Sequence, residues 1–387
     1  MKSYRDLYSR FLQAHSGVQH FASHSHHYWP DVTFEAHQQY WLDSCAYVDD
    51  KWDYFFSKKV PQAQRLIADI LNLSKPEQIV FAPNTHELCY RIFSCFPVNK
   101  KIRILTTDSE FYSFERQVVR FEESAGRVEV VRVATLPFHS FEERFAEEIQ
   151  KHCFDLIFVS QVFFNSGIAI KGLATLISQI QNPDTLMVID GYHGFMAVPT
   201  DLRGLENRIF YLAGSYKYAQ GGEGCCFMAS PAGNSFRPEY TGWFAGFDSL
   251  ANFDKQVQYS DDGYRFAGST MDFSALYRLI AALEKFKQEG LTVDLIHCYI
   301  QDLQKKFIQE VDGQDHMTVH SKNLLKKDLS YHGHFLTFQT ESPEECSRIT
   351  LALRKNKIWT DYRGNRLRFG FGLYHDSNYD LSALKKI

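Results

Sequence analysis

The chain has 387 residues, of which 44% are hydrophobic and 23% charged, and its formal net charge at pH 7 is −4. This size is enough for a large core and predicts one large and one smaller domain. A near-neutral charge without a basic block argues against nucleic acid or an anionic membrane as the main partner. The start, residues 1–13, is charged and lacks an apolar core, so we expect no signal peptide, and no apolar run is long enough to span a membrane.

The cysteines and histidines indicate no metal site. Eight cysteines are scattered along the chain without a zinc-like CxxC pair, and reduced thiols in a cytoplasmic protein are the simplest interpretation. Four histidines lie within residues 20–27, but their spacing matches no common zinc set and no acidic or cysteine partner stands beside them. We therefore expect no bound metal.

The N-terminal part is expected to be helical. Apolar residues between 3 and 15 recur at helical spacing and predict an amphipathic arm. Asp31 is expected to cap a long helix that ends near Tyr47, and Ser57 to start another whose apolar side includes Ile67 and Leu71.

Further along, short apolar runs alternate with amphipathic segments. We expect strands at residues 78–81, 102–106, 127–133, 155–160, 186–190, 208–213 and 225–229. A charged surface helix is expected at 137–150, and helices at 272–288, 291–311 and 343–355 flank a strand at 333–338. Such alternation predicts an α/β fold with a mostly parallel sheet covered by helices on both faces.

Two of the predicted strands end in residues that can carry chemistry. The first stops at Asp190, with His193 three residues on, and the second leads into Ser215-Tyr216-Lys217 and a glycine turn. Ligands of open α/β sheets bind outside the carboxyl ends of the strands. A lysine there can form a Schiff base, and a buried aspartate can hold a pyridinium nitrogen in its charged form, which is how proteins bind pyridoxal 5′-phosphate (PLP). Taken alone, an aspartate at a strand end is more often a helix cap, and a lysine after a strand is more often a solvated loop residue. The combination of both is more specific for a cofactor site.

This arrangement resembles the core of the class V aminotransferase superfamily, and within it kynureninase, which has D-x-x-H followed by S-Y-K-Y. The resemblance implies a PLP-dependent transferase-like (fold type I) three-layer α/β/α sandwich with a smaller α+β domain. It implies an N-terminal arm and helices (1–56) that join the small domain, a large PLP-binding domain (57–265) and a small C-terminal domain (266–387).

The resemblance also assigns cofactor ligands. Asn84 and Thr85 begin a helix, where the free N–H groups and the helix dipole favour a phosphate. An aromatic residue should stack on the ring, with Phe111 the best match and Tyr112 the reserve, and either Gln161 or Asn165 should reach the phenolic oxygen. The remaining cofactor contacts implied are Ser215, Trp243, and Ser269 with Thr270, the last two offered to the neighbouring subunit's phosphate.

Substrate contacts follow from the same likeness. The segment after the N-terminal helix should line the entrance, with His26 as its substrate-binding residue. A planar guanidinium can grip the substrate's α-carboxylate bidentately. Arg368 matches the family position, and Arg366, which alternates with it on the same face of a strand, stays the alternative.

The activity implied is that of a PLP-dependent enzyme acting on an α-amino acid through an external aldimine and a quinonoid. Lys217 would carry the cofactor, Asp190 would keep the ring nitrogen protonated, His193 would orient the ring and Tyr216 could move a proton. The main hypothesis is kynureninase-like hydrolytic Cβ–Cγ cleavage. The alternative is a class V aminotransferase or a β-lyase that acts on a small amino acid. The non-enzymatic alternative is a degenerate PLP-binding regulatory module. A homodimer with shared active sites is implied. Cysteine desulfurase is disfavoured, because residues 321–331 hold no cysteine where that class forms its persulfide.

Overall fold

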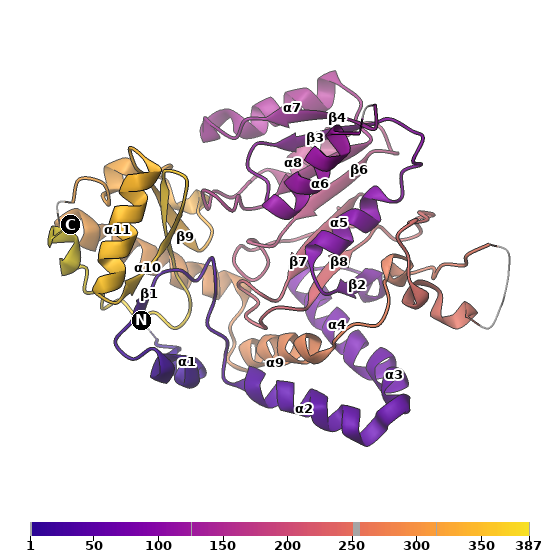
Figure 1. Ribbon diagram of the computed structural model, residues 1–387, viewed down its shortest axis with the longest axis horizontal. Helices are drawn as coiled ribbons and strands as arrows, with labels where there is room; N and C mark the ends of the chain where they lie inside the picture. The colour runs from indigo at the N-terminus through magenta and orange to yellow at the C-terminus, as the bar shows by residue number, and fades with distance from the viewer. Residues whose placement is uncertain (1, 125, 251–255, 315, 387) are drawn as a thin grey trace.

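A seven-stranded sheet forms the centre of the computed structural model, which describes residues 2–124, 126–250, 256–314 and 316–386 (Figure 1). The strand order is β2-β8-β7-β6-β5-β3-β4. The strands are β2 (Ile79–Ala82), β3 (Ile102–Thr107), β4 (Val128–Val133), β5 (Leu156–Ser160), β6 (Leu186–Asp190), β7 (Ile209–Gly214) and β8 (Cys226–Ala229). From β4 to β7 all neighbours are parallel, and β8 runs antiparallel to β7 and β2. The predicted mostly parallel sheet is confirmed.

Helices cover this sheet on both sides. Towards the top of Figure 1 lie α6 (Tyr112–Glu122), α7 (Phe141–Lys151) and α8 (Leu173–Ser178), while α2 (Val32–Tyr47), α4 (Val60–Leu71) and α9 (Ser274–Gln288) lie at the bottom, with the short α3 (Lys51–Tyr54) beside them. The central strands β5, β6 and β7 are buried along their whole length, as strands covered on both faces must be.

The start of α4 differs from the sequence expectation. A π-helical turn over Phe55–Lys59 stands where Ser57 was expected to begin the helix. Within α4, Val60, Ala63, Ile67 and Leu71 are buried at helical spacing, and the helix ends at Asn72 in the left-handed conformation.

The C-terminal part of the chain builds a second sheet, of order β11-β12-β9, at the left of Figure 1. Its strands are β9 (Phe335–Gln339), β11 (Asp361–Arg363) and β12 (Arg366–Gly370), accompanied by α10 (Val293–Gly313) and α11 (Pro343–Lys355). The N-terminal segment joins this part, because β1 (Gln19–His20) pairs in parallel with β10 (Ile358–Trp359). The first helix, α1 (Ser9–Ala14), lies beside it and is preceded by a 3-10 turn, so the expected arm is shorter and less regular than predicted.

Candidate active site

The carboxyl ends of β5, β6 and β7 meet at one edge of the central sheet. Ser160, the last residue of β5, is the register partner of Asp190, the last residue of β6, and Asp190 in turn is opposite Leu212 of β7. The chain after β7 therefore emerges next to Asp190, which brings the two polar clusters of the sequence to a common place. A crevice outside the carboxyl ends of parallel strands is where this class of fold binds ligands.

Lys217 points from this edge toward the N-terminal segment. Its Nζ donates hydrogen bonds to the carbonyl oxygens of His24 (2.7 Å) and Ser25 (3.0 Å). Burial, together with the positive charge of Arg368, lowers the pKa of Lys217 to about 7. A large share of this amine is therefore neutral near pH 7, as a nucleophile or a base must be.

Asp190 is a buried carboxyl group with spare acceptor capacity. Its Oδ1 accepts a hydrogen bond from the backbone N–H of Tyr192 (2.8 Å), and burial raises its pKa to about 6. A buried carboxylate in this state is stabilised by a cationic partner within reach.

His193 and Tyr216 both contact the N-terminal segment. Nε2 of His193 lies 3.2 Å from the carbonyl oxygen of His24, the same oxygen that accepts from Lys217, and burial lowers the pKa of this imidazole well below its usual value. The hydroxyl of Tyr216 lies 3.1 Å from Nδ1 of the partly exposed His26, whose ring also stands 3.9 Å from a carboxylate oxygen of Glu223. His26 is therefore next to the lysine-bearing loop, as an entrance residue should be.

A second buried carboxyl group at this edge was missed by the sequence reasoning. Glu110, after β3, accepts hydrogen bonds from the hydroxyl of Thr107 (2.7 Å) and from both the hydroxyl and the backbone N–H of Ser160. Burial raises its pKa to about 8. Glu110 thus links the ends of β3 and β5. In the sequence, its position after a buried strand was the one feature that could have identified it as a residue of this edge.

Three of the expected cofactor contacts, Asn84, Thr85 and Ser215, lie at two turns of this edge. Asn84 caps α5 (Thr85–Phe93) by accepting from the backbone N–H of Glu87 (2.9 Å), which is also its ordinary structural role. The hydroxyl of Ser215 donates to the carbonyl of Gly222 inside the glycine turn. Both side chains are thus fixed by local contacts, and Thr85 stands at the first helical position.

Gln161 and Asn165 differ in their remaining hydrogen-bonding capacity. Gln161 is engaged at both ends of its amide, accepting from the hydroxyl of Tyr211 (2.9 Å) and donating to that of Thr200 (2.8 Å). Asn165 donates to the hydroxyl of Ser109 (3.1 Å), and its other amide atom is buried without a partner among the described residues. Of the two, Asn165 has a polar atom left for a ligand.

Phe111 is 42% exposed and immediately precedes α6. Its ring stands edge-on to that of Phe164, with centroids 5.4 Å apart, and Tyr112 contacts the same ring. Phe111 is therefore partly accessible at the surface, and Tyr112 lies beside it, with ring centroids 5.7 Å apart.

Arg368 lies on β12 with its guanidinium already engaged. Its Nε and Nη2 donate to the two carboxylate oxygens of Asp361 (2.9 and 2.6 Å), and Nη1 donates to the carbonyl of Phe164. His24 contacts the same carboxylate at 2.6 Å through Nε2. The pKa of Asp361 lies well below its usual range, because these neighbours outweigh the opposing effect of burial. Arg366, on the same strand, is only partly buried and has Asp108 as its charged neighbour.

Trp243, Ser269 and Thr270 form a separate group of loops. The indole N–H of Trp243 donates to the hydroxyl of Thr270 (3.3 Å), and the backbone N–H of Phe244 donates to the carbonyl of Gly268 (3.1 Å). Among the described residues, the structure brings none of these side chains into contact with Lys217 or Asp190. They are therefore apart from the site within one chain.

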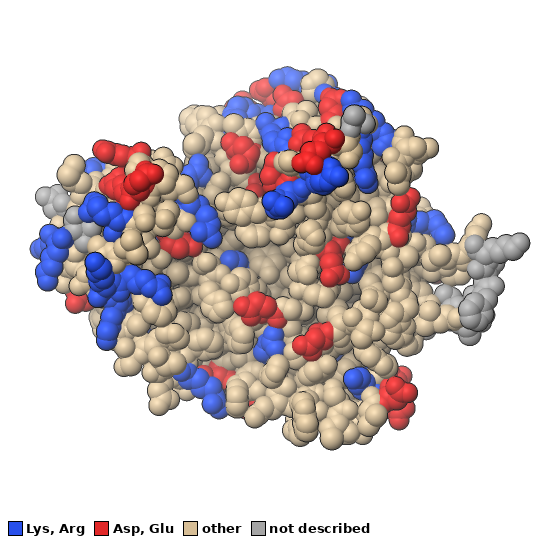
Figure 2. All heavy atoms as spheres, viewed as in Figure 1, with Lys and Arg blue, Asp and Glu red and all other residues tan. Residues whose placement is uncertain are grey.

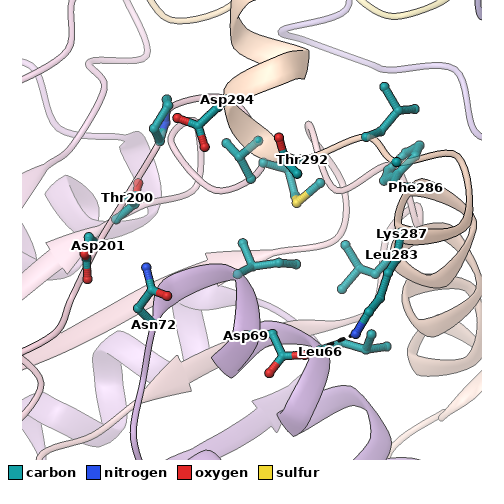
Figure 3. Close-up of a pocket in the computed structure, with 16 residues that line it drawn as sticks. Leu66, Asp69, Asn72, Thr200, Asp201, Leu283, Phe286, Lys287, Thr292 and Asp294 are labelled. Atoms are coloured by element: carbon teal, nitrogen blue, oxygen red, sulfur yellow. Dashed lines mark hydrogen bonds and ion pairs between the residues drawn. The ribbon is translucent and has the colours of Figure 1, made fainter.

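A different cavity, of about 560 Å³, lies between the C-terminal ends of α4 and α9 and the start of α10 (Figure 3). Its wall is largely apolar, and at its rim Lys287 pairs with Asp69 at 3.3 Å. None of the candidate site residues lines it. Within the described ranges, no group of three or more histidine, cysteine or acidic side chains is placed to hold a metal ion.

The sequence profile of aminotransferase class V matches residues 28–361. The chain belongs to the class V aminotransferase family. Comparison with curated proteins gave no match. Among solved structures, the cystine C-S lyase C-DES in complex with cysteine persulfide is 16% identical, covers 97% of each chain and has a TM-score of 0.78. The cysteine desulfurase CsdA from Escherichia coli is also 16% identical, with 99% of this chain and 96% of that one covered and a TM-score of 0.79.

A third similar structure is the cysteine desulfurase from Thermococcus onnurineus NA1, at 16% identity and a TM-score of 0.77, over 100% of this chain and 96% of that one. Another structure of the C-S lyase, a variant, holds glycine covalently linked to PLP. The fold type I expectation is confirmed. The finer likeness to kynureninase is not supported, since these similar structures are named as a C-S lyase and as desulfurases.

PLP is the cofactor of this family, and the residues present fit it. A lysine amine with a pKa of about 7 suits a Schiff base, and the buried Asp190, with an unshared oxygen and a raised pKa, suits a protonated ring nitrogen. The unpartnered amide atom of Asn165 is a further polar group that a bound ligand could satisfy.

Proposed function

We propose that the protein is a PLP-dependent β-lyase that acts on a small amino acid carrying a sulfur leaving group at Cβ. The observation that carries this proposal is the amine of Lys217, about half neutral at pH 7, in the segment that follows β7 at the sheet edge where the buried Asp190 ends β6. The names of the similar structures, a C-S lyase and cysteine desulfurases, support sulfur amino acids as the substrate class.

The cysteines favour a lyase over a desulfurase. Residues 321–331 contain no cysteine, and the exposed thiols Cys45, Cys153 and Cys298 lie on α2, after α7 and on α10. None of the three is among the described contacts of Lys217. Among the described residues, none of these three exposed thiols is therefore placed beside Lys217 to accept sulfur, and we expect the leaving group to depart into solution.

When bound, PLP supplies the electron sink that allows the Cα–H bond of the amino acid to ionise. Lys217 would take the α-proton, and Asp190 would hold the proton on the ring nitrogen. Loss of the Cβ substituent with the electron pair of its Cβ–S bond, followed by hydrolysis, would yield a thiol, a keto acid and ammonia. Tyr216, hydrogen-bonded to His26, can hand a proton to the departing sulfur.

Arg368 is our candidate for the substrate's α-carboxylate. Because Asp361 occupies two of its nitrogens and a carbonyl the third, the substrate has to share or displace these contacts. His26, half-exposed beside Tyr216, is the candidate contact for the substrate side chain.

We further propose a homodimer. The surface along α2, at the bottom of Figure 2, carries few charges, and Phe34, Trp41, Leu42 and Tyr47 are exposed on that helix. Exposed apolar groups of this density mark interaction surfaces. In such a dimer Ser269 and Thr270 would approach the second subunit's cofactor.

Product analysis tests the reaction. The holoprotein is incubated with cystine, S-alkylcysteines, kynurenine and common amino acids, and the products are identified by mass spectrometry. Pyruvate with ammonia and a released thiol or persulfide is expected from the sulfur substrates. Alanine as the main product would indicate desulfuration or kynureninase-like cleavage instead, and a keto acid formed only with an amino acceptor would indicate transamination.

A further inference from the structure

A buried arginine, Arg91, lies outside the site described above, next to the loops that contain Gly242 and Gly268. Arg91, on α5, is 3% exposed, and its Nη2 donates to the carboxylate of Glu87 one helical turn earlier (2.7 Å). Its Nε and Nη1 are buried and have no hydrogen-bond partner among the described residues. A guanidinium carries five donors, and buried donors in native proteins are nearly always satisfied.

Arg91 lines a cavity of about 200 Å³ between the start of α5 and the loops 240–244 and 268–271. A water molecule takes up roughly 30 Å³, so a tetrahedral oxyanion fits in this space. Ser269 and Thr270 line the same cavity, and a hydroxyl group can donate a hydrogen bond to an anion.

The loops are shaped around the arginine. A Cβ on Gly268 would stand 2.3 Å from Nη2 of Arg91, and a Cβ on Gly242 would stand 2.3 Å from the backbone of Gly268. The two glycines therefore let the loops close over the guanidinium. The ring of Tyr240 lies 5.8 Å from its central carbon and covers another side.

Charge balance also favours an anion at this place. Among the described residues, the partly exposed Glu87 is the one carboxylate paired with Arg91, and burial lowers the pKa of the guanidinium despite that neighbour. A second negative group would satisfy the donors that Glu87 leaves free.

We propose that this cavity binds a phosphate- or sulfate-class oxyanion through Arg91, with help from Ser269 and Thr270. The proposal does not depend on the reaction assigned above. The cavity shares no lining residue with Asn84, Thr85, Lys217 or Asp190, and Arg91 lies about 9 Å along the helix from Thr85, at about 1.5 Å per residue. The oxyanion has two possible sources, a free inorganic ion or the phosphate of the cofactor held by a second copy of the chain.

Calorimetric titration of the holoprotein with inorganic phosphate and with sulfate forms the first arm of the test. Binding of one ion per chain is expected, weakened about tenfold or more in Arg91→Gln and only partly restored in Arg91→Lys, because an ammonium lacks the planar fork. Glu87→Gln, which removes the competing carboxylate, should bind the ion more tightly than the wild type. Arg120→Gln is the control, since Arg120 is exposed and paired with Glu123.

The second arm measures the affinity of the cofactor-free protein for PLP. A free-ion site leaves this affinity unchanged in Arg91→Gln, whereas a site for the neighbouring cofactor's phosphate weakens it by about tenfold, and inorganic phosphate then competes with PLP. The proposal is overturned if wild-type protein binds no oxyanion and Arg91→Gln also keeps its affinity for PLP. It is also overturned if the wild-type protein binds the ion and a folded Arg91→Gln binds it with the same affinity.

Discussion

Asp361 closes the guanidinium fork of Arg368 through two hydrogen bonds, of 2.9 and 2.6 Å, inside the protein. The carboxylate that a substrate would offer to this arginine is thus already present in the chain, and Nε2 of His24 contacts the same oxygen that accepts from Nε of Arg368. Removing one partner of a buried ion pair leaves a charge without compensation, which costs far more than the pair itself contributes.

Asp361→Ala should therefore destabilise the protein by about 3–5 kcal/mol, measured by urea unfolding. Asp201→Ala serves as the matched control, because Asp201 grips Arg203 in a similar way at the surface, where solvent screens the pair. Equal losses of unfolding free energy in the two variants would show that burial of the Asp361–Arg368 pair does not determine the effect on stability.

Lys217 should carry the cofactor and give the cofactor-free chain a specific pH dependence. Its pKa of about 7 lies below the ordinary lysine value of 10.5, so between these values the unfolded chain binds more protons than the native one. The free energy of unfolding should consequently rise with pH in this window. Comparing wild type with Lys217→Met from pH 7 to 9 isolates the effect, and a constant difference in unfolding free energy between the two would contradict it.

Borohydride reduction of the holoprotein should place the pyridoxyl group on Lys217.

Asp190→Ala should lower turnover by about 10²–10³-fold or more, because the ring nitrogen loses the charge that keeps it protonated. The absorbance of the lysine-bound cofactor should persist. Glu110→Gln is the comparison, since this second buried carboxyl, with a pKa of about 8, is largely protonated at neutral pH and the amide preserves its shape. Comparable losses in both variants would argue for a general packing defect.

Tyr216→Phe and His26→Ala should slow the reaction in a way that depends on the leaving group. If this pair protonates the departing sulfur, kcat should fall about 10²–10⁴-fold for substrates that release a basic thiolate. For substrates that release an acidic thiol, kcat should change little. The measurement is kcat across a series of S-substituted cysteines. A uniform reduction across the series would assign the pair to substrate positioning.

Trp41→Glu should weaken self-association, because Trp41 is 67% exposed on α2, the surface proposed for the dimer. Light scattering at micromolar protein should show a shift from dimer to monomer. Leu351→Glu changes a similarly exposed residue (59%) on α11 and should leave the dimer intact. A wild-type protein that is active as a monomer would contradict the proposed homodimer.

The sequence predicted the central sheet and the positions of Asp190 and Lys217 because both depend on local patterns. Buried strands are continuous apolar runs, and the residue that ends such a run lies at the ligand edge of a parallel sheet. Boundaries shifted where local geometry intervened, as at the π-helical turn before α4.

What the sequence could not predict depends on contacts between distant segments. The pairing of Asp361 with Arg368 and His24 requires the register of β11 against β12 and the path of the N-terminal segment. The role of Glu110 follows from β3 and β5 being neighbours, which chain order alone does not show. Among the described residues no helix has the length and apolar character to cross a bilayer.

The carbonyl oxygen of His24 receives the amine of Lys217 from 193 residues further along the chain. Because that acceptor is a main-chain atom, no side-chain replacement at position 24 deletes it. This oxygen is synthesised before Lys217, and Lys217 in turn before Arg368, whose charge lowers the lysine's pKa. A fragment spanning 57–265 contains both Asp190 and Lys217 but lacks the acceptor of His24 and the charge of Arg368, so it should not reproduce the lowered pKa of the amine.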